Sequence, residues 1–190
     1  MLRKNRPKIK AKLPDTIEIP YALLEEKKYF PTMRKWGDNR SISSYLLLIR
    51  ESARIGKNEF FLDIEDFAAE LQMPKDWTDT AKRRQVIKTL KKLSNKYELI
   101  TATFTHGQDA YIKLAELQGD TFTIKSGIFD ADFLAKASPT AKTVLLINVL
   151  LKDEGHKRED FSKEALRKRF NTTPKQFRKG IKELELIEVE

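Results

Sequence analysis

Apolar and polar residues in the first part of the chain follow a strand-like spacing and then a helix-like spacing. Residues 15–20 read DTIEIP and alternate Ile17 and Ile19 with polar neighbours, which predicts a short half-buried strand. Residues 21–30 have a helical pattern, and the proline-containing segment 31–39 is expected to be a loop.

A long helix, a strand and two further helices are expected next. The long helix begins near Ser41, and residues 59–63, EFFLD, are apolar enough for a strand. Asp63 can cap a helix that ends before Pro74, and Thr78, Asp79 or Thr80 can cap the helix after it. The inner faces of the three helices are expected to be Ile42, Tyr45, Leu46 and Ile49; Ile64, Phe67 and Leu71; and Val86, Ile87, Leu90 and Leu93.

Two alternating runs then flank a glycine-containing turn. Residues 98–104 and 110–117 alternate apolar and polar positions around THGQD, residues 105–109, which predicts a β-hairpin. The predicted order is therefore helix, strand, helix, helix, hairpin. This is the order of a winged helix, a form of the helix-turn-helix in which the second of two packed helices presents a face to DNA.

The same order of patterns then starts again, which predicts an internal duplication. The segment from Asp120 is similar to that from Asp15, TAKTVLLINVLL is similar to SSYLLLIRES, and SKEALRKRF is similar to DIEDFAAEL. NTTPKQFRKGIKEL, residues 171–184, repeats TAKRRQVIKTLKKL, residues 80–93. ELELIEV, residues 183–189, matches the first strand of the hairpin, so the second copy is expected to have one wing strand. The offset between equivalent residues falls along the chain from 105 to 99 to 91, as loops of different length would produce.

These patterns predict an α+β fold, mainly α, with two tandem winged-helix (helix-turn-helix) domains that form an internal pseudo-dimer. Residues 1–13 are expected to be a disordered basic arm. Domain 1 is expected to span residues 14–118, and domain 2, with a short wing, residues 119–190.

Charge and composition favour an acidic partner. The formal net charge is +9, and the arm alone carries six basic residues and no acid, which leaves +3 for the remainder. The chain has no cysteine, which excludes disulfides, thiolate zinc sites and cysteine nucleophiles. Its longest apolar runs are shorter than the ~18 residues of a membrane span, so we expect a cytoplasmic protein without a membrane partner.

No arrangement of residues indicates an enzyme. The acidic group Asp63, Glu65 and Asp66 lies at a predicted helix start, where capping and the helix dipole favour acids. His106 and His156 lie far apart in predicted turns, and no spacing typical of a metal site surrounds them. Trp36 and Trp77 are expected to be core or packing residues. We therefore expect no catalytic residue, cofactor or metal.

Helix 80–93 and its repeat are the candidate DNA-binding elements, because an α-helix fits the major groove of DNA. Candidate contacts in the first copy are Lys82, Arg84, Gln85, Lys88 and Lys92, and in the second Thr172, Thr173, Lys175, Gln176, Arg178, Lys179 and Lys182. Arg3 and Arg6 of the arm are candidate phosphate or minor-groove contacts. The alternative is that the basic helix faces are only solvated and the arm only aids solubility. Both helices carry a basic residue, Gln, an apolar residue and then Lys three positions after the Gln, which favours DNA binding.

Two such units in one short basic chain, with the helices RQVIK and KQFRK, resemble the DNA-binding accessory or regulatory proteins of Gram-positive conjugative plasmid transfer regions, of TraN type. The resemblance extends from Asp15 to Glu190. It implies a monomer with internal pseudo-two-fold symmetry that binds double-stranded DNA near the origin of transfer. Regulation of transfer genes and contacts with other conjugation or replication proteins are also implied.

Three alternative hypotheses about function stay open. Plasmid replication initiators and transcriptional regulators of tandem winged-helix plan are similar in architecture. A winged-helix adaptor that binds protein and not DNA is the third, and it would be expected to expose apolar stripes on the helices that are basic in this chain.

Overall fold

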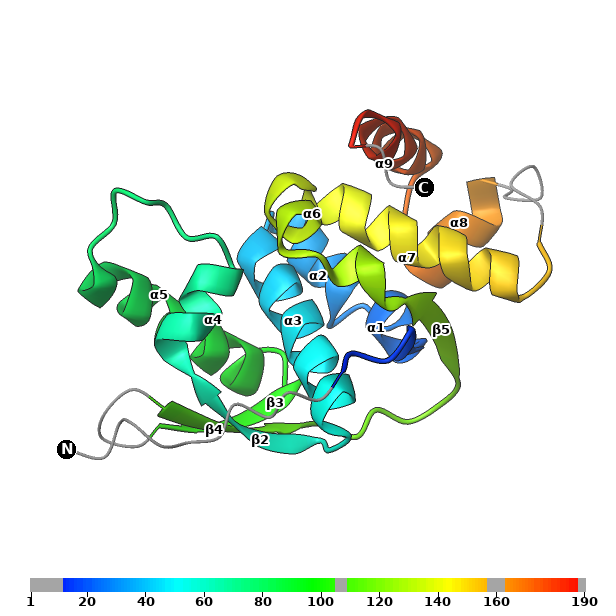
Figure 1. Ribbon diagram of the computed structural model, residues 1–190. Coiled ribbons are helices and arrows are strands. Elements are labelled where there is room, and N and C mark those ends of the chain that lie inside the picture. Colours follow the sequence, from blue (N-terminus) through cyan, green and yellow to red (C-terminus); the bar gives the residue numbers. More distant parts are fainter. Residues whose placement is uncertain (1–11, 105–108, 157–162, 188–190) are drawn as a thin grey trace.

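The computed structural model describes residues 12–104, 109–156 and 163–187, and in them the chain is α+β and mainly helical (Figure 1). A two-stranded antiparallel ribbon pairs β1 (Thr16–Pro20) with β5 (Thr121–Lys125). A three-stranded antiparallel sheet has the order β2 (Glu59–Asp63), β4 (Asp109–Leu114), β3 (Ile100–Phe104). The helices are α1 (Ala22–Glu25), α2 (Phe30–Lys35), α3 (Asn39–Ile55), α4 (Ile64–Glu70), α5 (Asp79–Asn95), the 3-10 helix η1 (Ser126–Phe129), α6 (Ala131–Lys136), α7 (Pro139–Asp153), α8 (Lys163–Phe170) and α9 (Pro174–Leu186).

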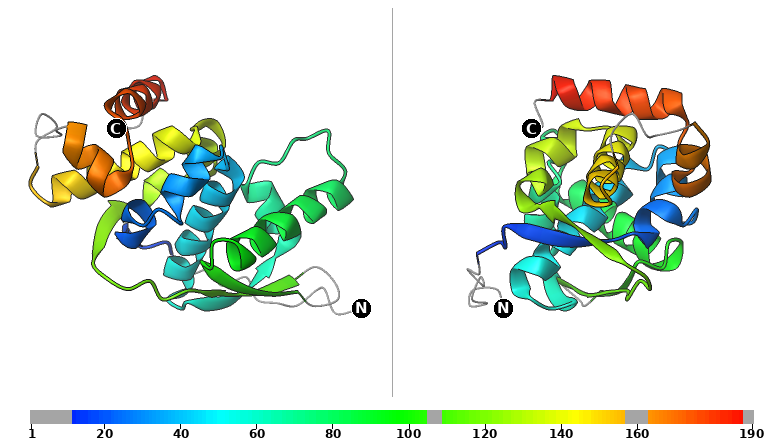
Figure 2. Two further views of the ribbon diagram at one scale, coloured as in Figure 1. Left: turned by 180° about the vertical axis from the view of Figure 1, so that it is seen from behind. Right: turned by 90° about the vertical axis from the view of Figure 1, so that its right-hand side faces the viewer.

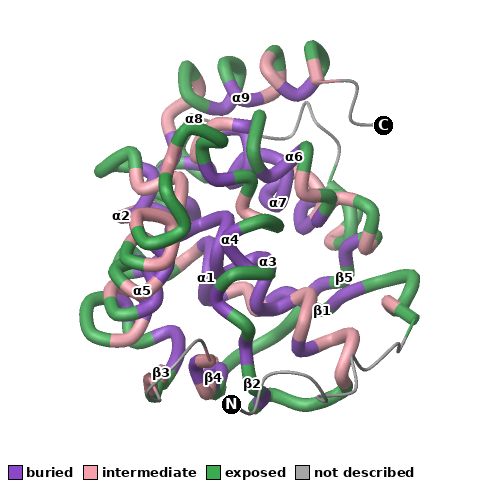
Figure 3. Tube along the Cα trace, turned by 60° about the vertical axis from the view of Figure 1, so that its left-hand side comes forward, coloured by how far each residue is buried: buried purple, intermediate pink, exposed green. Residues whose placement is uncertain are grey.

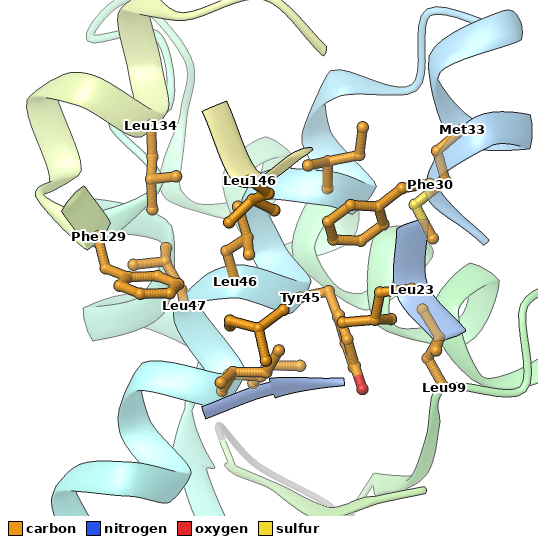
Figure 4. Close-up of a cluster of buried hydrophobic side chains, with 14 of the residues drawn as sticks. Leu23, Phe30, Met33, Tyr45, Leu46, Leu47, Leu99, Phe129, Leu134 and Leu146 are labelled. Atoms are coloured by element: carbon orange, nitrogen blue, oxygen red, sulfur yellow. The ribbon is translucent and has the colours of Figure 1, made fainter. Parts of the chain in front are cut away.

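Helices α3 and α7 form the centre of one continuous hydrophobic core. α3 is buried around nearly its whole circumference, so the predicted inner face of this helix is confirmed but is only part of the buried surface. In Figure 4, Leu46 and Leu47 of α3 lie between Phe30 on one side and Phe129 and Leu134 on the other. Residues from both ends of the chain therefore share this core. None of the helices in the described ranges is long and apolar enough to cross a membrane.

The first half contains the predicted order of helix, strand, helix, helix and hairpin. β2 alternates buried Phe60 and Leu62 with exposed residues, so one face of the sheet packs on the helices. The Asp63 carboxylate accepts hydrogen bonds from the backbone N–H groups of Glu65 (2.8 Å) and Asp66 (2.9 Å), which starts α4 as predicted. Thr78, one of the three predicted candidates, caps α5.

The pairing of β1 with β5 agrees with the predicted repeat offset of 105 residues. Thr16 pairs with Lys125 and Pro20 with Thr121, so Glu18 faces Thr123, its own equivalent in the repeat. The backbone N–H of Tyr21 donates to Asp120 O (3.0 Å), and the equivalent N–H of Ser126 donates to Asp15 O (2.9 Å). The ribbon is thus locally two-fold symmetric about the Glu18–Thr123 pair.

Two further pairs of equivalent features lie outside the ribbon. Gln72 follows α4 with φ 47° and Asn171 follows α8 with φ 48°, and these left-handed residues are 99 positions apart. The residue that caps α3, Asp38, pairs with Lys92 at 2.5 Å. Ser138, which caps α7, donates hydrogen bonds from its backbone N–H and its hydroxyl to the Glu183 carboxylate (both 2.7 Å). Glu183 lies 91 positions after Lys92, so in both halves the residue that caps the long helix is bound by the same position of the later helix.

Four local predictions were wrong. The helix expected over residues 21–30 ends at Glu25, and a turn separates α1 from α2. Segment 31–39 is not all loop, because residue 31 is a proline at the start of α2, where its missing N–H costs no helical hydrogen bond. Residues 183–186 are helical and not a wing strand, since α9 runs to Leu186 and its Leu184 is buried on the same helix face as Phe177. Trp36 is 68% exposed and is not a core residue. Trp77 is half-buried against the core, as expected.

A buried lysine joins the two central helices. Lys142 of α7 is 1% exposed, and its ammonium donates hydrogen bonds to Ser43 Oγ (2.7 Å) and to Asn39 Oδ1, both on α3. Burial lowers the pKa of Lys142 to about 7, although the Glu183 carboxylate partly opposes this shift. A neutral amine therefore suits this position better than an ammonium.

We predict that the free energy of unfolding rises between pH 7 and about pH 9.5 because of Lys142. The folded protein releases this proton near pH 7, whereas the unfolded chain retains it up to about 10.5, so unfolding takes up a proton in this window. The expected slope is at most about 1.4 kcal/mol per pH unit, and the contribution is least favourable below pH 7. Urea unfolding across this range would measure it. Lys142→Met should remove the slope, and an unchanged slope in that variant would contradict the assignment.

Candidate nucleic-acid interface

The solvent-facing side of α5 is a basic stripe. Arg84, Lys88 and Lys91 are exposed at the spacing i, i+4, i+7, which places them on one side of the helix. The opposite side is buried through Val86, Leu90 and other apolar residues, which hold α5 against α3, α4 and β3. Among the residues that the structure describes, no carboxylate forms an ion pair with these three side chains.

Helix α9 has the same stripe at the equivalent positions. Lys175, Lys179 and Lys182 are exposed, and each lies 91 residues after its counterpart in α5. The buried positions agree as well, because Phe177 is equivalent to Val86 and Leu184 to Leu93. Figure 3 shows exposed turns of α9 on its outer side and buried segments toward α7. Figures 1 and 2 show α5 and α9 in different parts of the molecule, with α3 and α7 between them.

Gly180 allows α9 to approach α7 closely. A Cβ atom at this position would lie 2.7 Å from Val144 Cγ2 and 2.8 Å from Val144 Cβ, closer than real side chains come. Gly180 is equivalent to Thr89 of α5, which is also buried. The side chain of residue 180 therefore sets how close α9 lies to α7, and with it the position of the basic stripe.

Several residues predicted to contact DNA instead interact with acidic residues of the protein. Lys92 does not belong to the exposed stripe, since it is paired with Asp38, which also accepts a hydrogen bond from Tyr97 Oη (2.9 Å). Burial raises the pKa of Asp38, but hydrogen bonds from Lys92 and Tyr97 outweigh burial and lower it overall. Lys82 is half-buried with Asp79 3.9 Å away, so it lies beside the stripe.

Thr172 is not a surface residue, contrary to prediction. It is 0% exposed, and its Oγ1 accepts a hydrogen bond from Arg34 Nη1 (2.5 Å) and donates to Phe170 O (3.0 Å). Arg34 Nη2 also donates to Asn171 O (2.6 Å). The turn between α8 and α9 is thus held by α2, and burial lowers the pKa of the Arg34 guanidinium. Thr172 thus helps to fix the start of α9 through its hydrogen bond with Arg34 of α2.

Thr172→Val should lower the free energy of unfolding by about 1–3 kcal/mol, because Arg34 would lose a hydrogen-bond acceptor while remaining buried. Thr172→Ser retains the hydroxyl and is the matched control, which should cost less. Chemical denaturation of both variants tests this assignment. Equal losses in the two variants would mean that the methyl group of Thr172, and not its hydroxyl, is the important part.

Both glutamines of the repeated pattern form side-chain hydrogen bonds with nearby residues of the protein. Gln176 Oε1 accepts from the backbone N–H of Thr173 (2.9 Å), whose hydroxyl accepts from Gln176 N–H (3.2 Å), which forms a capping box. Gln85 is half-buried, and its Nε2 lies 3.5 Å from Thr89 Oγ1. Thr173 and Gln176 are therefore at the surface but fix the start of α9. Arg178 is exposed, and its Nε is 3.4 Å from Pro174 O within the same helix.

The candidate contacts did not include Lys91, Arg167 or Lys168. Lys91 completes the stripe of α5, as the predicted Lys182 does on α9, but a lysine three positions beyond Lys88 has no signal of its own without the helix geometry. Arg167 and Lys168 are exposed on α8, whereas the equivalent helix α4 exposes Glu65, Asp66 and Glu70. The second half therefore presents more positive charge around its candidate helix than the first. Arg3 and Arg6 lie outside the described residues.

Metal ligands are not clustered in the described ranges. In residues 12–104, 109–156 and 163–187, no group of three or more His, Cys, Asp or Glu side chains could hold a metal ion. Asp63 acts as a helix cap, and His156 is exposed near Glu154 (3.7 Å). The hollow between α4 and α5 is lined by both apolar residues, such as Ala68 and Met73, and charged residues, such as Asp79 and Arg83.

Comparison with known proteins found no matching family model, no matching curated protein and no matching solved structure. The two basic stripes and the fold that positions them are therefore the features that bear on function.

Proposed function

We propose that this chain is a double-stranded DNA-binding protein, without enzymatic activity, built from two winged-helix units. The observation that carries the proposal is the equivalence of the basic stripes, Arg84, Lys88 and Lys91 on α5 and Lys175, Lys179 and Lys182 on α9. A single basic helix face is commonly only solvated. Two faces that agree in spacing, charge and exposure at a constant offset of 91 residues are better explained by a shared ligand.

The surrounding fold supports this role for α5. In a winged helix, the second helix of the pair enters the major groove while the first packs across it. α4 and α5 have this order, and the sheet β2-β4-β3 packs beside them. Arg84 and Gln85 lie near the beginning of α5, the part of a recognition helix that contacts base edges. Lys88 and Lys91, further along, suit phosphates.

The pairing of two units within one chain gives the DNA site its expected form. The local two-fold symmetry of the ribbon around Glu18 and Thr123 supports an arrangement in which the two halves are related as the subunits of a dimer are. Two recognition helices in such an arrangement read successive major grooves about 34 Å apart. Because the stripe of α5 begins with Arg84 where that of α9 begins with Lys175, and because α4 is acidic where α8 is basic, the two half-sites should be related but unequal.

We place the target on a mobile genetic element, near an origin of transfer, with regulation of transfer genes as the biological role. This part rests on the resemblance to transfer-region proteins of TraN type. A replication initiator or another transcriptional regulator would use the same two helices, so the DNA-binding experiment below applies to all three. A protein-binding adaptor would instead leave DNA unbound.

Fluorescence anisotropy with a labelled duplex tests the proposal. The wild-type protein should bind a random-sequence 30-base-pair duplex at low salt, with log Kd rising steeply against log salt because Lys and Arg release counterions from the phosphates. Replacing the three residues of either stripe by alanine should weaken this binding. The matched control is a triple variant of exposed lysines away from both stripes, Lys57→Ala, Lys125→Ala and Lys152→Ala, which removes the same charge as replacing one stripe. No binding by the wild type at low salt would overturn the proposal.

A further inference from the structure

An exposed tryptophan lies beside the candidate interface. Trp36, the residue that ends α2, is 68% exposed, although Trp is usually among the more buried residue types. Lys35 Nζ and Lys96 Nζ each lie 5.8 Å from the centroid of its ring. The ring is therefore accessible and has two ammonium groups next to it, an arrangement in which cation–π attraction orders the lysines.

The two lysines beside the ring are not neutralised by the acidic residues close to them in sequence. Asp38 is engaged by Lys92, and Glu98 is engaged by Lys28 at 3.8 Å. In the part of the chain that the structure describes, no carboxylate forms an ion pair with Lys35 or Lys96. The patch is thus an aromatic surface with two available positive charges.

The patch continues the surface of α5. Lys96 caps the C-terminal end of this helix, and it follows Gln85 and Lys92 at i+11 and i+4, so the three share the side of α5 that borders the exposed stripe. A duplex that receives α5 in its major groove would bring its backbone past this side of the helix. Charge complementarity and continuity with α5 both point to the sugar–phosphate backbone.

We propose that Trp36, Lys35 and Lys96 form a backbone contact for duplex DNA that flanks the groove occupied by α5. The indole ring packs on deoxyribose, and the two ammonium groups bind neighbouring phosphates. This contact reads no base, so it contributes affinity to every sequence equally. The proposal rests on the proposed DNA-binding function and adds a second surface to it.

Intrinsic fluorescence isolates this contact, because the chain has only two tryptophans. Trp77→Phe leaves Trp36 as the sole indole and keeps an aromatic ring at the half-buried position 77. On titration with an unlabelled duplex, Trp36 emission should change saturably, with the same midpoint as anisotropy of a labelled duplex. Unchanged emission while anisotropy reports binding would overturn this contact but leave the proposed function intact. Absence of binding by anisotropy would overturn both.

Side-chain variants give a second measurement of the same contact. Trp36→Ala should weaken duplex binding about tenfold, to a similar extent for different sequences, and Trp36→Phe should weaken it less. Lys35→Met and Lys96→Met should each reduce the slope of log Kd against log salt by about 1. Lys125→Met, on β5, is the control and should leave the slope unchanged. A response of Trp36 to single-stranded oligonucleotide but not to duplex would overturn the duplex assignment.

Discussion

Replacing the stripe of α5 by alanine, Arg84→Ala, Lys88→Ala and Lys91→Ala together, is expected to weaken duplex binding by at least about 100-fold. Each side chain is exposed, and alanine is a good helix former, so the fold should be kept. Because the two phosphate contacts of Lys88 and Lys91 are removed together with the base contact of Arg84, the slope of log Kd against log salt should fall by about 2. Anisotropy at several salt concentrations, with circular dichroism as a check on folding, measures both effects.

The corresponding variant of α9, Lys175→Ala, Lys179→Ala and Lys182→Ala, separates two explanations of this loss. If both helices bind DNA, each triple variant should weaken binding strongly, whereas the control variant of Lys57, Lys125 and Lys152 should have a small effect. If the control loses as much affinity as the stripes do, binding depends only on net charge, and the stripes have no special role.

Gly180→Leu is expected to lower the free energy of unfolding by about 3 kcal/mol. Even the first carbon of a new side chain would lie 2.7 Å from Val144 Cγ2, and the rest of the leucine has no space between α9 and α7. Gly127 is the matched control, since a Cβ atom there would have no neighbour within 4 Å. Gly127→Leu should therefore cost much less in the same chemical denaturation experiment.

A double-mutant cycle tests whether Val144 is the cause. Gly180→Ala gains helix propensity of about 1 kcal/mol but collides with Val144. Val144→Ala removes the two methyl groups that lie 2.7 Å and 3.1 Å from the new Cβ and keeps the Cβ of residue 144, so it relieves part of the collision. The double variant should be more stable than the sum of the single effects by about 1 kcal/mol or more. Additive effects would mean that α9 moves away from α7 easily and that Gly180 does not fix its position.

Local pattern was sufficient to predict most elements of the fold. Alternation around Ile17 and Ile19 predicted β1, and helical spacing predicted the inner faces of α3 and α5. These elements bury one face each, so their residues carry the signal directly. Pro31 was misread because proline both interrupts helices and begins them. Leu184 and Leu186 alternate as in a strand, but Leu184 is buried with Phe177 as in a helix.

Site residues were harder to predict, because their partners are distant in sequence. Thr172 appears polar and accessible in the sequence, yet its hydroxyl is bound by Arg34, 138 residues earlier. Lys92 likewise pairs with Asp38, which no spacing rule connects to it. Arg84, Lys88, Lys175, Lys179 and Lys182 were predicted as candidates and are exposed on the two helices. Whether they bind DNA stays a prediction.

The most direct test of the account is selection of bound sequences from a pool of random duplexes by the wild-type protein and by the two stripe variants. We predict a bipartite site whose two related but unequal halves lie about 10 base pairs apart, the spacing of successive major grooves. Each stripe variant should lose the preference for one half and keep the other. Enrichment of a single undivided site, or of no sequence at all, would contradict the claim that α5 and α9 act as a pair of DNA-reading helices.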